Sequence, residues 1–212
     1  IKDNILDQNS IIKSYKRVSS FYDLTFGQVF RPGQKAIIKK MDCLDTDNVL
    51  EIGIGTGSSL QYYPSETKVV GIDISPDMLH LAQKKITNDN IPNKHILMMN
   101  GERLCFPDNT FDKVVGMYVV SVTQNPQILV EEMKRVCKND GDIYIVNHFS
   151  TEQDNTFVKM FEKGLMPISK ILGWKPYFPF DEFNAYANLD VLEMSKVNLF
   201  NYWNIIHASN NK

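Results

Sequence analysis

The chain has 212 residues, of which 43% are hydrophobic and 23% are charged, and its formal net charge is −2. This composition predicts one folded domain with a sizeable core and excludes a chain that is disordered throughout. No apolar run is long enough to span a bilayer and no secretory signal is expected, which favours a cytoplasmic location. The small negative charge also excludes a nucleic-acid binder with a basic surface throughout.

The charge is distributed unevenly along the chain. Residues 1–41 contain eight Lys or Arg and three Asp, a net charge of +5, and residues 42–212 carry −7. A basic amino-terminal fifth on an acidic body predicts contact with a local anionic partner or a membrane surface.

The three cysteines, Cys43, Cys105 and Cys137, are far apart and odd in number, and no CxxC or zinc-type Cys/His spacing occurs. We therefore expect buried thiols in a reducing compartment and no metal site.

The first 41 residues read as helical. Apolar residues recur every three or four positions over 10–30, which predicts an amphipathic helix. Pro32-Gly33 should end that helix, and a shorter helix should follow through Met41.

From residue 48, short apolar runs alternate with helical patterns. Strands are predicted over residues 49–53, 68–74, 95–99, 111–120 and 142–149, and helices over 76–86 and 128–137. This alternation indicates βαβ units and a parallel sheet with both faces covered.

The alternation stops after residue 149. Residues 155–173 read as helical, 173–180 are irregular, and two strand-like runs follow over 191–200 and 202–208. We expect one domain over residues 1–212, made of a helical cap (1–41), a cofactor-binding core (42–149), a helical insert or lid (150–189) and the last two strands (190–212).

Glycine occupies every second position just after the first core strand, at Gly53, Gly55 and Gly57. Glycine permits positive φ and lets a ligand approach the backbone. Asp73 ends the next strand, 20 residues after Gly53, where its carboxylate can accept both hydroxyls of a ribose. The two features imply an adenosine-containing ligand. Ser58 stands where a dinucleotide motif would have its third glycine, and no phosphate-loop motif is present.

The segment from Glu51 to Gly57 resembles the glycine motif of class I S-adenosylmethionine-dependent methyltransferases. Three later segments also resemble that family: Asn100-Gly101-Glu102, residues 107–112 and residues 131–141. The resemblance implies a Rossmann-like α/β fold, with a mostly parallel seven-stranded sheet, helices on both faces and a helical cap. It implies that S-adenosyl-L-methionine is the cofactor and S-adenosyl-L-homocysteine its product. The implied cofactor-binding residues are Tyr15, Tyr22, Glu51, Gly53, Gly55, Gly57, Asp73, Ile74, Met78, Gly101, Glu102 and Tyr118.

Residues 14–27, Val146-Asn147-His148-Phe149 and residues 172–180 resemble the bacterial soluble phosphatidylethanolamine N-methyltransferases. This resemblance implies methyl transfer to the amine of phosphatidylethanolamine, toward phosphatidylcholine, by a monomer at the cytoplasmic face of the membrane. Tyr22, His148 and Asn147 are the candidate catalytic residues. Lys16, Arg17, Arg31, Lys35 and Trp174 are the candidates for contact with the substrate or an anionic membrane surface.

Each role has an alternative. Tyr15 and Tyr22 could simply pack a helix against the core, and His148 could be a hydrogen-bonded histidine at the sheet edge. Gly101 could be an ordinary turn glycine and Glu102 a solvated carboxylate. For the whole chain, the alternatives are a methyltransferase acting on a quinone or another small apolar molecule, and a non-catalytic module that binds the cofactor.

Overall fold

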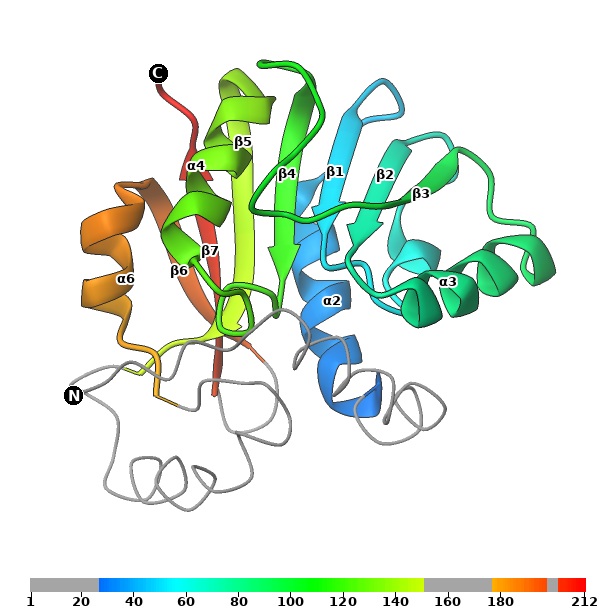
Figure 1. Cartoon of the computed structure of the whole chain (residues 1–212), viewed down its shortest axis with the longest axis horizontal. Coiled ribbons are helices and arrows are strands. Elements are labelled where there is room, and N and C mark those ends of the chain that lie inside the picture. Colours follow the sequence, from blue (N-terminus) through cyan, green and yellow to red (C-terminus); the bar gives the residue numbers. More distant parts are fainter. Residues whose placement is uncertain (1–26, 151–176, 198–201) are drawn as a thin grey trace.

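The computed structural model describes residues 27–150, 177–197 and 202–212 (Figure 1). Within them, a sheet runs in the order β3-β2-β1-β4-β5-β7-β6. The strands are β1 Asn48–Ile52, β2 Lys68–Asp73, β3 Lys94–Met98, β4 Phe111–Met117, β5 Cys137–His148, β6 Asp190–Val197 and β7 Trp203–Ser209. The first five are parallel to one another, and β7 is antiparallel to both β5 and β6.

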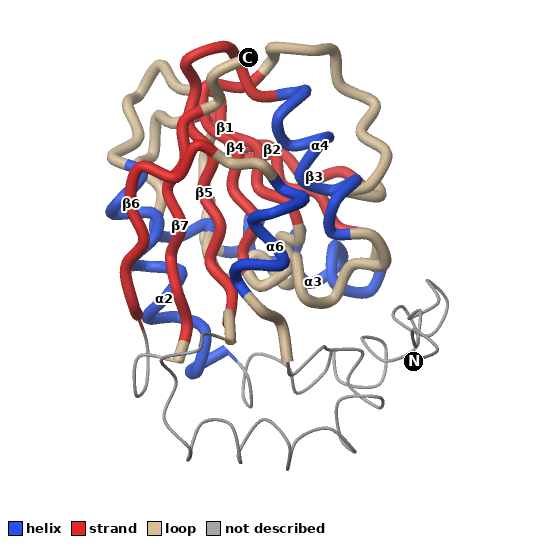
Figure 2. The backbone as a smooth tube through the Cα atoms, turned by 90° about the vertical axis from the view of Figure 1, so that its left-hand side faces the viewer, coloured by secondary structure: helices blue, strands red, loops and turns tan. Residues whose placement is uncertain are grey.

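Helices cover both faces of this sheet (Figure 2). They are α2 Gly27–Met41, α3 Pro76–Asn88, α4 Pro126–Val136 and α6 Phe180–Ala187, with a 3-10 turn η1 at Leu60–Tyr62. One core lies between the sheet and α4 and α6, and includes Leu50, Leu129 and Phe183. A second core lies on the other face, where Ile37 of α2 and Leu79 of α3 pack. This is the doubly covered, mostly parallel sheet that the sequence predicts.

Local sequence explains where the helices begin. Ser75 precedes α3, and its hydroxyl accepts a hydrogen bond from the Met78 amide; Pro76 occupies the first helical position. Asn125 precedes α4 in the same way, accepting from the Ile128 amide at 3.2 Å. These side chains satisfy amide groups that have no partner within the helix.

Pro32-Gly33 does not end a helix, so that prediction is wrong. Pro32 lies inside α2, which begins at Gly27 and runs without interruption to Met41. A proline removes one helical hydrogen bond. Farther along, Ile37, Ile38 and Met41 are buried, and we attribute the continuity of α2 to that packing. The rest of the helix predicted over residues 10–30 lies outside the described residues, as does the helix predicted over 155–173.

The expected insert over residues 150–189 includes α6, which sequence periodicity does not reveal. Phe183 and Ala187 of α6 share a core with α4. Ahead of α6, Pro179 forms an isolated bridge with Ser150 just beyond β5. This part of the predicted lid therefore belongs to the body of the domain.

The cysteines are free thiols, but only Cys137 is buried; Cys43 is half-buried and Cys105 is exposed. The expectation of three buried thiols is therefore wrong for Cys105, which lies in the β3–β4 loop. Burial raises the pKa of Cys43 to about 11 and that of Cys137 to about 12, so both thiols stay protonated at neutral pH.

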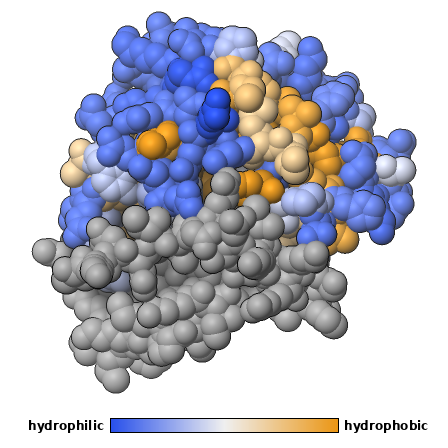
Figure 3. Space-filling view, in the orientation of Figure 1, coloured by the Kyte–Doolittle hydropathy of each residue, from blue (hydrophilic) through white to orange (hydrophobic). Residues whose placement is uncertain are grey.

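Within the described ranges, no helix combines the length and apolar character needed to cross a bilayer. Figure 3 shows apolar side chains gathered on this face of the molecule. In β3, Leu97 and Met98 are 43% and 68% exposed. On that side of the sheet the β3–β4 loop crosses in front of the strands (Figure 1).

Candidate functional site

The glycine turn after β1 requires its glycines for two different reasons. Gly53, Gly55 and Gly57 all have positive φ, between 54° and 77°, a conformation that other residues rarely adopt. A Cβ on Gly57 would lie 3.0 Å from the Cβ of Ala82, so this glycine lets the turn pack closely on α3. A Cβ on Gly55 would meet nothing within 4 Å. Gly55 therefore presents bare backbone to open space.

Asp73 lies at the end of β2, beside this turn. Its carboxylate accepts hydrogen bonds from the Gly55 amide and the Ser75 amide, both at 2.9 Å. Burial raises the pKa of Asp73, and these backbone hydrogen bonds oppose the rise. Asp73 thus holds the glycine turn in place from the position where the sequence predicts a ribose-binding carboxylate.

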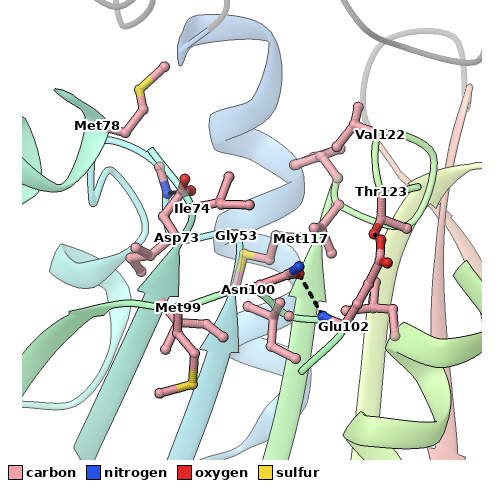
Figure 4. Close-up of a pocket in the computed structure, with 18 of the residues that line it drawn as sticks. Gly53, Asp73, Ile74, Met78, Met99, Asn100, Glu102, Met117, Val122 and Thr123 are labelled. Atoms are coloured by element: carbon pink, nitrogen blue, oxygen red, sulfur yellow. Dashed lines mark hydrogen bonds between the residues drawn. The ribbon is translucent and has the colours of Figure 1, made fainter. Parts of the chain in front are cut away.

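A pocket opens at the carboxyl ends of β1, β2, β3 and β4 (Figure 4). This is the edge of a parallel sheet at which ligands bind in open α/β folds. Its lining includes the polar side chains of Asp73, Asn100 and Glu102 and the apolar side chains of Met78, Met99 and Met117. The predicted residues that line it are Gly53, Gly55, Asp73, Ile74, Met78, Gly101, Glu102 and Tyr118.

Glu102 joins two loops that border the pocket. Its amide donates to the Asn100 side chain at 2.9 Å (Figure 4). Its carboxylate accepts hydrogen bonds from the Thr123 hydroxyl and, at 2.9 Å, from the Asn125 amide. The predicted adenine-side carboxylate therefore also ties the segment after β3 to the segment after β4.

The Glu132–Arg135 pair on α4 fixes the loop that carries Asn100 and Glu102. Arg135 donates to the carbonyls of Leu104 and Phe106, and Glu132 accepts from the Leu104 amide at 2.6 Å. The Arg135 guanidinium lowers the pKa of the Glu132 carboxyl. The family-like segment over residues 131–136 thus acts by holding the β3–β4 loop.

Tyr118 follows β4 in a left-handed conformation, with φ of 59°. Its amide donates to the Val146 carbonyl at 2.7 Å, and its hydroxyl donates to the Phe30 carbonyl at 3.1 Å. Its ring lies 4.4 Å from the ring of Phe30, centroid to centroid. The residue therefore links α2 to the ends of β4 and β5 at the pocket wall.

Glu51 does not line the pocket, although the sequence predicts it there. Its carboxylate is buried behind the glycine turn and accepts hydrogen bonds from the Ser59 hydroxyl at 2.7 Å and the Tyr63 hydroxyl at 2.8 Å. Burial raises the pKa of Glu51 to about 7, against the effect of both hydrogen bonds. In this structure Glu51 therefore holds the residues that follow the glycine turn, through its hydrogen bonds with Ser59 and Tyr63. Gly57 also lies off the pocket, for the packing reason given above.

Asn147 and His148 are buried at the end of β5 and do not line the pocket either. The Asn147 side chain accepts from the Ser121 hydroxyl at 3.1 Å and donates to the His148 carbonyl at 2.7 Å. The His148 ring stacks on Tyr202 with centroids 5.7 Å apart. A primary amide is not a base at neutral pH, and both of these Asn147 contacts are to protein groups, so its catalytic role stays a prediction. The catalytic role of His148 stays a prediction.

Only some of the residues predicted to contact the substrate or the membrane lie in the described part of the chain. Arg31 and Lys35 are exposed on α2, one turn apart, and the exposed Lys39 follows at the same spacing. Lys40 forms an ion pair with Glu193 of β6. Tyr15, Lys16, Arg17, Tyr22 and Trp174 lie outside the described residues.

The pocket also contains residues that the sequence did not single out. Met99 directly follows β3 and Met117 ends β4. Both could have been found by treating every residue at the carboxyl end of a predicted strand as a candidate pocket residue. Phe30 and Gln34 come from α2; the Gln34 side-chain amide donates to the Ser58 hydroxyl at 2.9 Å. No local pattern distinguishes these two helical residues from others that face the sheet.

Taken together, the described residues fit an adenosylated amino acid. A carboxylate stands at the second strand, bare glycine backbone faces the space beside it, and thioether side chains offer apolar, polarizable surface to a flat base.

Comparison with known proteins agrees with this fit. A profile of the methyltransferase domain family matches residues 50–145. The phosphatidylethanolamine N-methyltransferase of Cereibacter sphaeroides is 36% identical over 201 residues, covering 93% of this chain and 97% of that protein. A demethylmenaquinone methyltransferase of Listeria monocytogenes is 30% identical over 181 residues, covering 83% of this chain and 65% of that protein.

A solved structure shows the same fold. Phosphoethanolamine N-methyltransferase 2 of Haemonchus contortus, in complex with S-adenosyl-L-methionine, superposes with a TM-score of 0.75 at 16% identity, covering 95% of this chain and 60% of that one. Since the likeness to the Cereibacter enzyme extends over nearly the full length of both chains, this protein belongs to the class I S-adenosylmethionine-dependent methyltransferases, in the family of the bacterial phosphatidylethanolamine N-methyltransferases.

Proposed function

We propose that this methyltransferase transfers methyl groups from S-adenosylmethionine to the amine of phosphatidylethanolamine, at the cytoplasmic surface of an anionic membrane. The observation that carries the proposal is the 36% identity to the Cereibacter phosphatidylethanolamine N-methyltransferase over 97% of that protein. The chain's position within that family favours the same acceptor, because the likeness includes the parts outside the cofactor-binding core.

The pocket residues hold the cofactor in this proposal. Gly53 and Gly55 let the amino-acid part approach the backbone, and Asp73 accepts hydrogen bonds from the ribose hydroxyls. Ile74, Met78 and Met99 surround the base, with Gly101 and Glu102 at its edge. When bound, S-adenosylmethionine supplies a methyl group on a positively charged sulfur.

The acceptor amine attacks that methyl group in line: a nitrogen–carbon bond forms as the carbon–sulfur bond breaks, and the electron pair stays on sulfur. The amine must be neutral to attack, so a proton leaves it first or during transfer. Alignment can supply much of the rate. We assign the alignment of the amine with the methyl group to the pocket residues on α2 and directly after β4, such as Phe30 and Tyr118.

The basic stripe on α2 supports the membrane part of the proposal. Arg31, Lys35 and Lys39 are exposed and spaced four apart, so they share one side of the helix. Phe30 and Gln34 of the same helix line the pocket. Because α2 carries both the basic residues and two pocket-lining residues, adsorption of α2 would bring the pocket close to an anionic surface. Each basic residue near such a surface contributes about 1 kcal/mol to membrane binding.

A transfer assay tests the acceptor. The purified chain is incubated with S-adenosylmethionine labelled on its methyl group and with vesicles of phosphatidylethanolamine and phosphatidylglycerol. Vesicles of phosphatidylglycerol alone are the control, and a demethylmenaquinone is offered separately. We expect label in the phosphatidylethanolamine fraction, with Asp73→Ala reducing it. Label in the quinone and none in the lipid would reject the proposal and favour the second candidate, a quinone methyltransferase, to which the Listeria relative points.

A further inference from the structure

Three aromatic rings from distant parts of the chain meet beside the pocket. Phe30 comes from α2, Tyr118 follows β4, and Trp203 begins β7. The Trp203 ring centroid lies 6.1 Å from that of Phe30 and 6.2 Å from that of Tyr118, with interplanar angles of 86° and 88°. Trp203 is paired in the sheet with His148, the last residue of β5. The cluster therefore stands at the same edge of the sheet as the pocket.

All three side chains are half-buried, so they form part of a surface as well as of a core. Phe30 and Tyr118 also line the pocket. Tyr202 continues the aromatic surface, with its ring 4.9 Å from that of Trp203 at 88°. Trp203 stands nearly perpendicular to Phe30, Tyr118 and Tyr202, whereas the Phe30 and Tyr118 rings are tilted by 38° to each other. The result is an aromatic wall whose Phe30 and Tyr118 rings border the pocket and whose Trp203 ring packs beside them.

The backbone of Tyr118 adopts an unfavourable conformation to place its ring in this wall. A bulky residue with φ of 59° is rare, and such residues concentrate at functional sites. Two hydrogen bonds, to the Val146 carbonyl and the Phe30 carbonyl, hold it there. The second of these also fixes Tyr118 relative to Phe30.

The chemistry of the proposed acceptor suggests what such a wall would bind. Each methyl transfer removes an N–H and adds an apolar group, and the final product carries a permanent positive charge without any N–H. That group cannot donate an N–H hydrogen bond to an acceptor, whereas aromatic faces attract it through their quadrupoles. The described carboxylates in the pocket, Asp73 and Glu102, both accept hydrogen bonds from protein groups.

We propose that Phe30, Tyr118 and Trp203 form a binding site for the methylated ammonium of the lipid head group. The inference rests on the proposed function and names the residues that favour the methylated intermediates and the phosphatidylcholine product over unmethylated lipid. An aromatic wall holds the amine without accepting a hydrogen bond from it.

Binding of a charged ligand and its neutral isostere tests the site without methyl transfer. The ligands are dihexanoyl-phosphatidylcholine and the same lipid with 3,3-dimethylbutanol in place of choline, which replaces the nitrogen by carbon. Calorimetry with saturating S-adenosylhomocysteine should show that the wild type prefers the charged lipid by about tenfold. Trp203→Leu should abolish most of that preference, and Trp203→Phe should keep part of it.

Controls separate this role from simple packing. Phe106→Leu removes a half-buried ring that packs on Phe111 outside the pocket lining, and should keep the tenfold preference. If Trp203→Leu does not fold, Phe30→Leu provides the second test. Equal affinity of the wild type for the two lipids, or an unchanged preference in the folded variants, would overturn the inference.

Two further measurements distinguish a site for the lipid ammonium from a role of the same rings in binding the cofactor. The sulfur of S-adenosylmethionine is also a cation, so the affinities for S-adenosylmethionine and S-adenosylhomocysteine are measured in the same variants. Loss of affinity for S-adenosylmethionine alone, with the lipid preference intact, would assign the rings to the cofactor and refute the proposal. A charge preference in a protein that methylates no phosphatidylethanolamine would support the ammonium site and reject the proposed reaction.

Discussion

Glu51 provides a quantitative test of the buried network behind the glycine turn. Its carboxylate is 1% exposed and is held by Ser59 and Tyr63 at 2.7 and 2.8 Å. Burial favours the neutral carboxylic acid and raises the pKa of Glu51 from 4.5 to about 7. At about 1.4 kcal/mol per pKa unit, this rise corresponds to about 3 kcal/mol between the two protonation states.

Proton linkage gives the direction in which the Glu51 contribution to stability changes with pH. Between pH 4.5 and about 7 the folded chain binds more protons at Glu51 than the unfolded chain does. The contribution of Glu51 to stability is therefore fully present below pH 4.5 and is lost as the pH rises through about 7. Gln has the shape of the protonated side chain and does not titrate. Glu51→Gln should thus remove this part of the pH dependence.

Urea unfolding of both proteins from pH 4.5 to pH 8 measures the effect. The unfolding free energy of Glu51→Gln, minus that of the wild type, should rise by about 3 kcal/mol across this range. Glu131→Gln, at an exposed carboxylate on α4, is the matched control and should show a nearly constant difference. A Glu51→Gln difference that does not change with pH would show that Glu51 ionises normally in the fold, and the argument from burial would be wrong.

Three further predictions concern the turn, the cofactor and the membrane. Asp73→Ala should weaken S-adenosylhomocysteine binding by about tenfold or more, since each 1.4 kcal/mol of lost binding is tenfold; unchanged affinity by calorimetry would remove Asp73 from the site. Gly57→Ala should lower the unfolding free energy by about 1–3 kcal/mol, because the new Cβ lies 3.0 Å from that of Ala82 at a positive φ; a wild-type urea midpoint would contradict this. Arg31→Glu combined with Lys35→Glu should weaken binding to phosphatidylglycerol vesicles by about 1 kcal/mol or more per residue and reduce its salt dependence. Equal sedimentation of variant and wild type with these vesicles, with phosphatidylcholine vesicles as control, would leave the basic stripe without a role.

Features with a local cause could be predicted from the sequence. The three glycines and Asp73 were identified because a tight turn and a strand-end carboxylate impose their residue types on a short segment. The order of strands and helices through the core followed from the period of the apolar residues. In the same way, Pro76 marks the start of α3 directly in the sequence. The helix predicted over residues 128–137 begins earlier, at Pro126, where Asn125 caps it.

Features that depend on packing between distant residues could not be predicted in this way. Pro32 reads as a helix end, yet it lies inside α2, whose later turns are buried against the sheet. Glu51 belongs to a cofactor motif, yet Ser59 and Tyr63 hold it behind the turn. No sequence pattern marks α6, because only its packing on α4 gives it a core.

The sequence by itself therefore determined the family, the cofactor turn and the layout of the sheet, because each depends on residues that are neighbours along the chain. Only the tertiary structure decided which side chains face the pocket. Phe30 and Tyr118 line it with Trp203 packed beside them, and the three meet only because β4 and β5 pair, β7 returns beside β5, and α2 packs on one face of the sheet. A site assembled by sheet pairing has no signature in any one segment, since its spacing is set by strand register and helix packing.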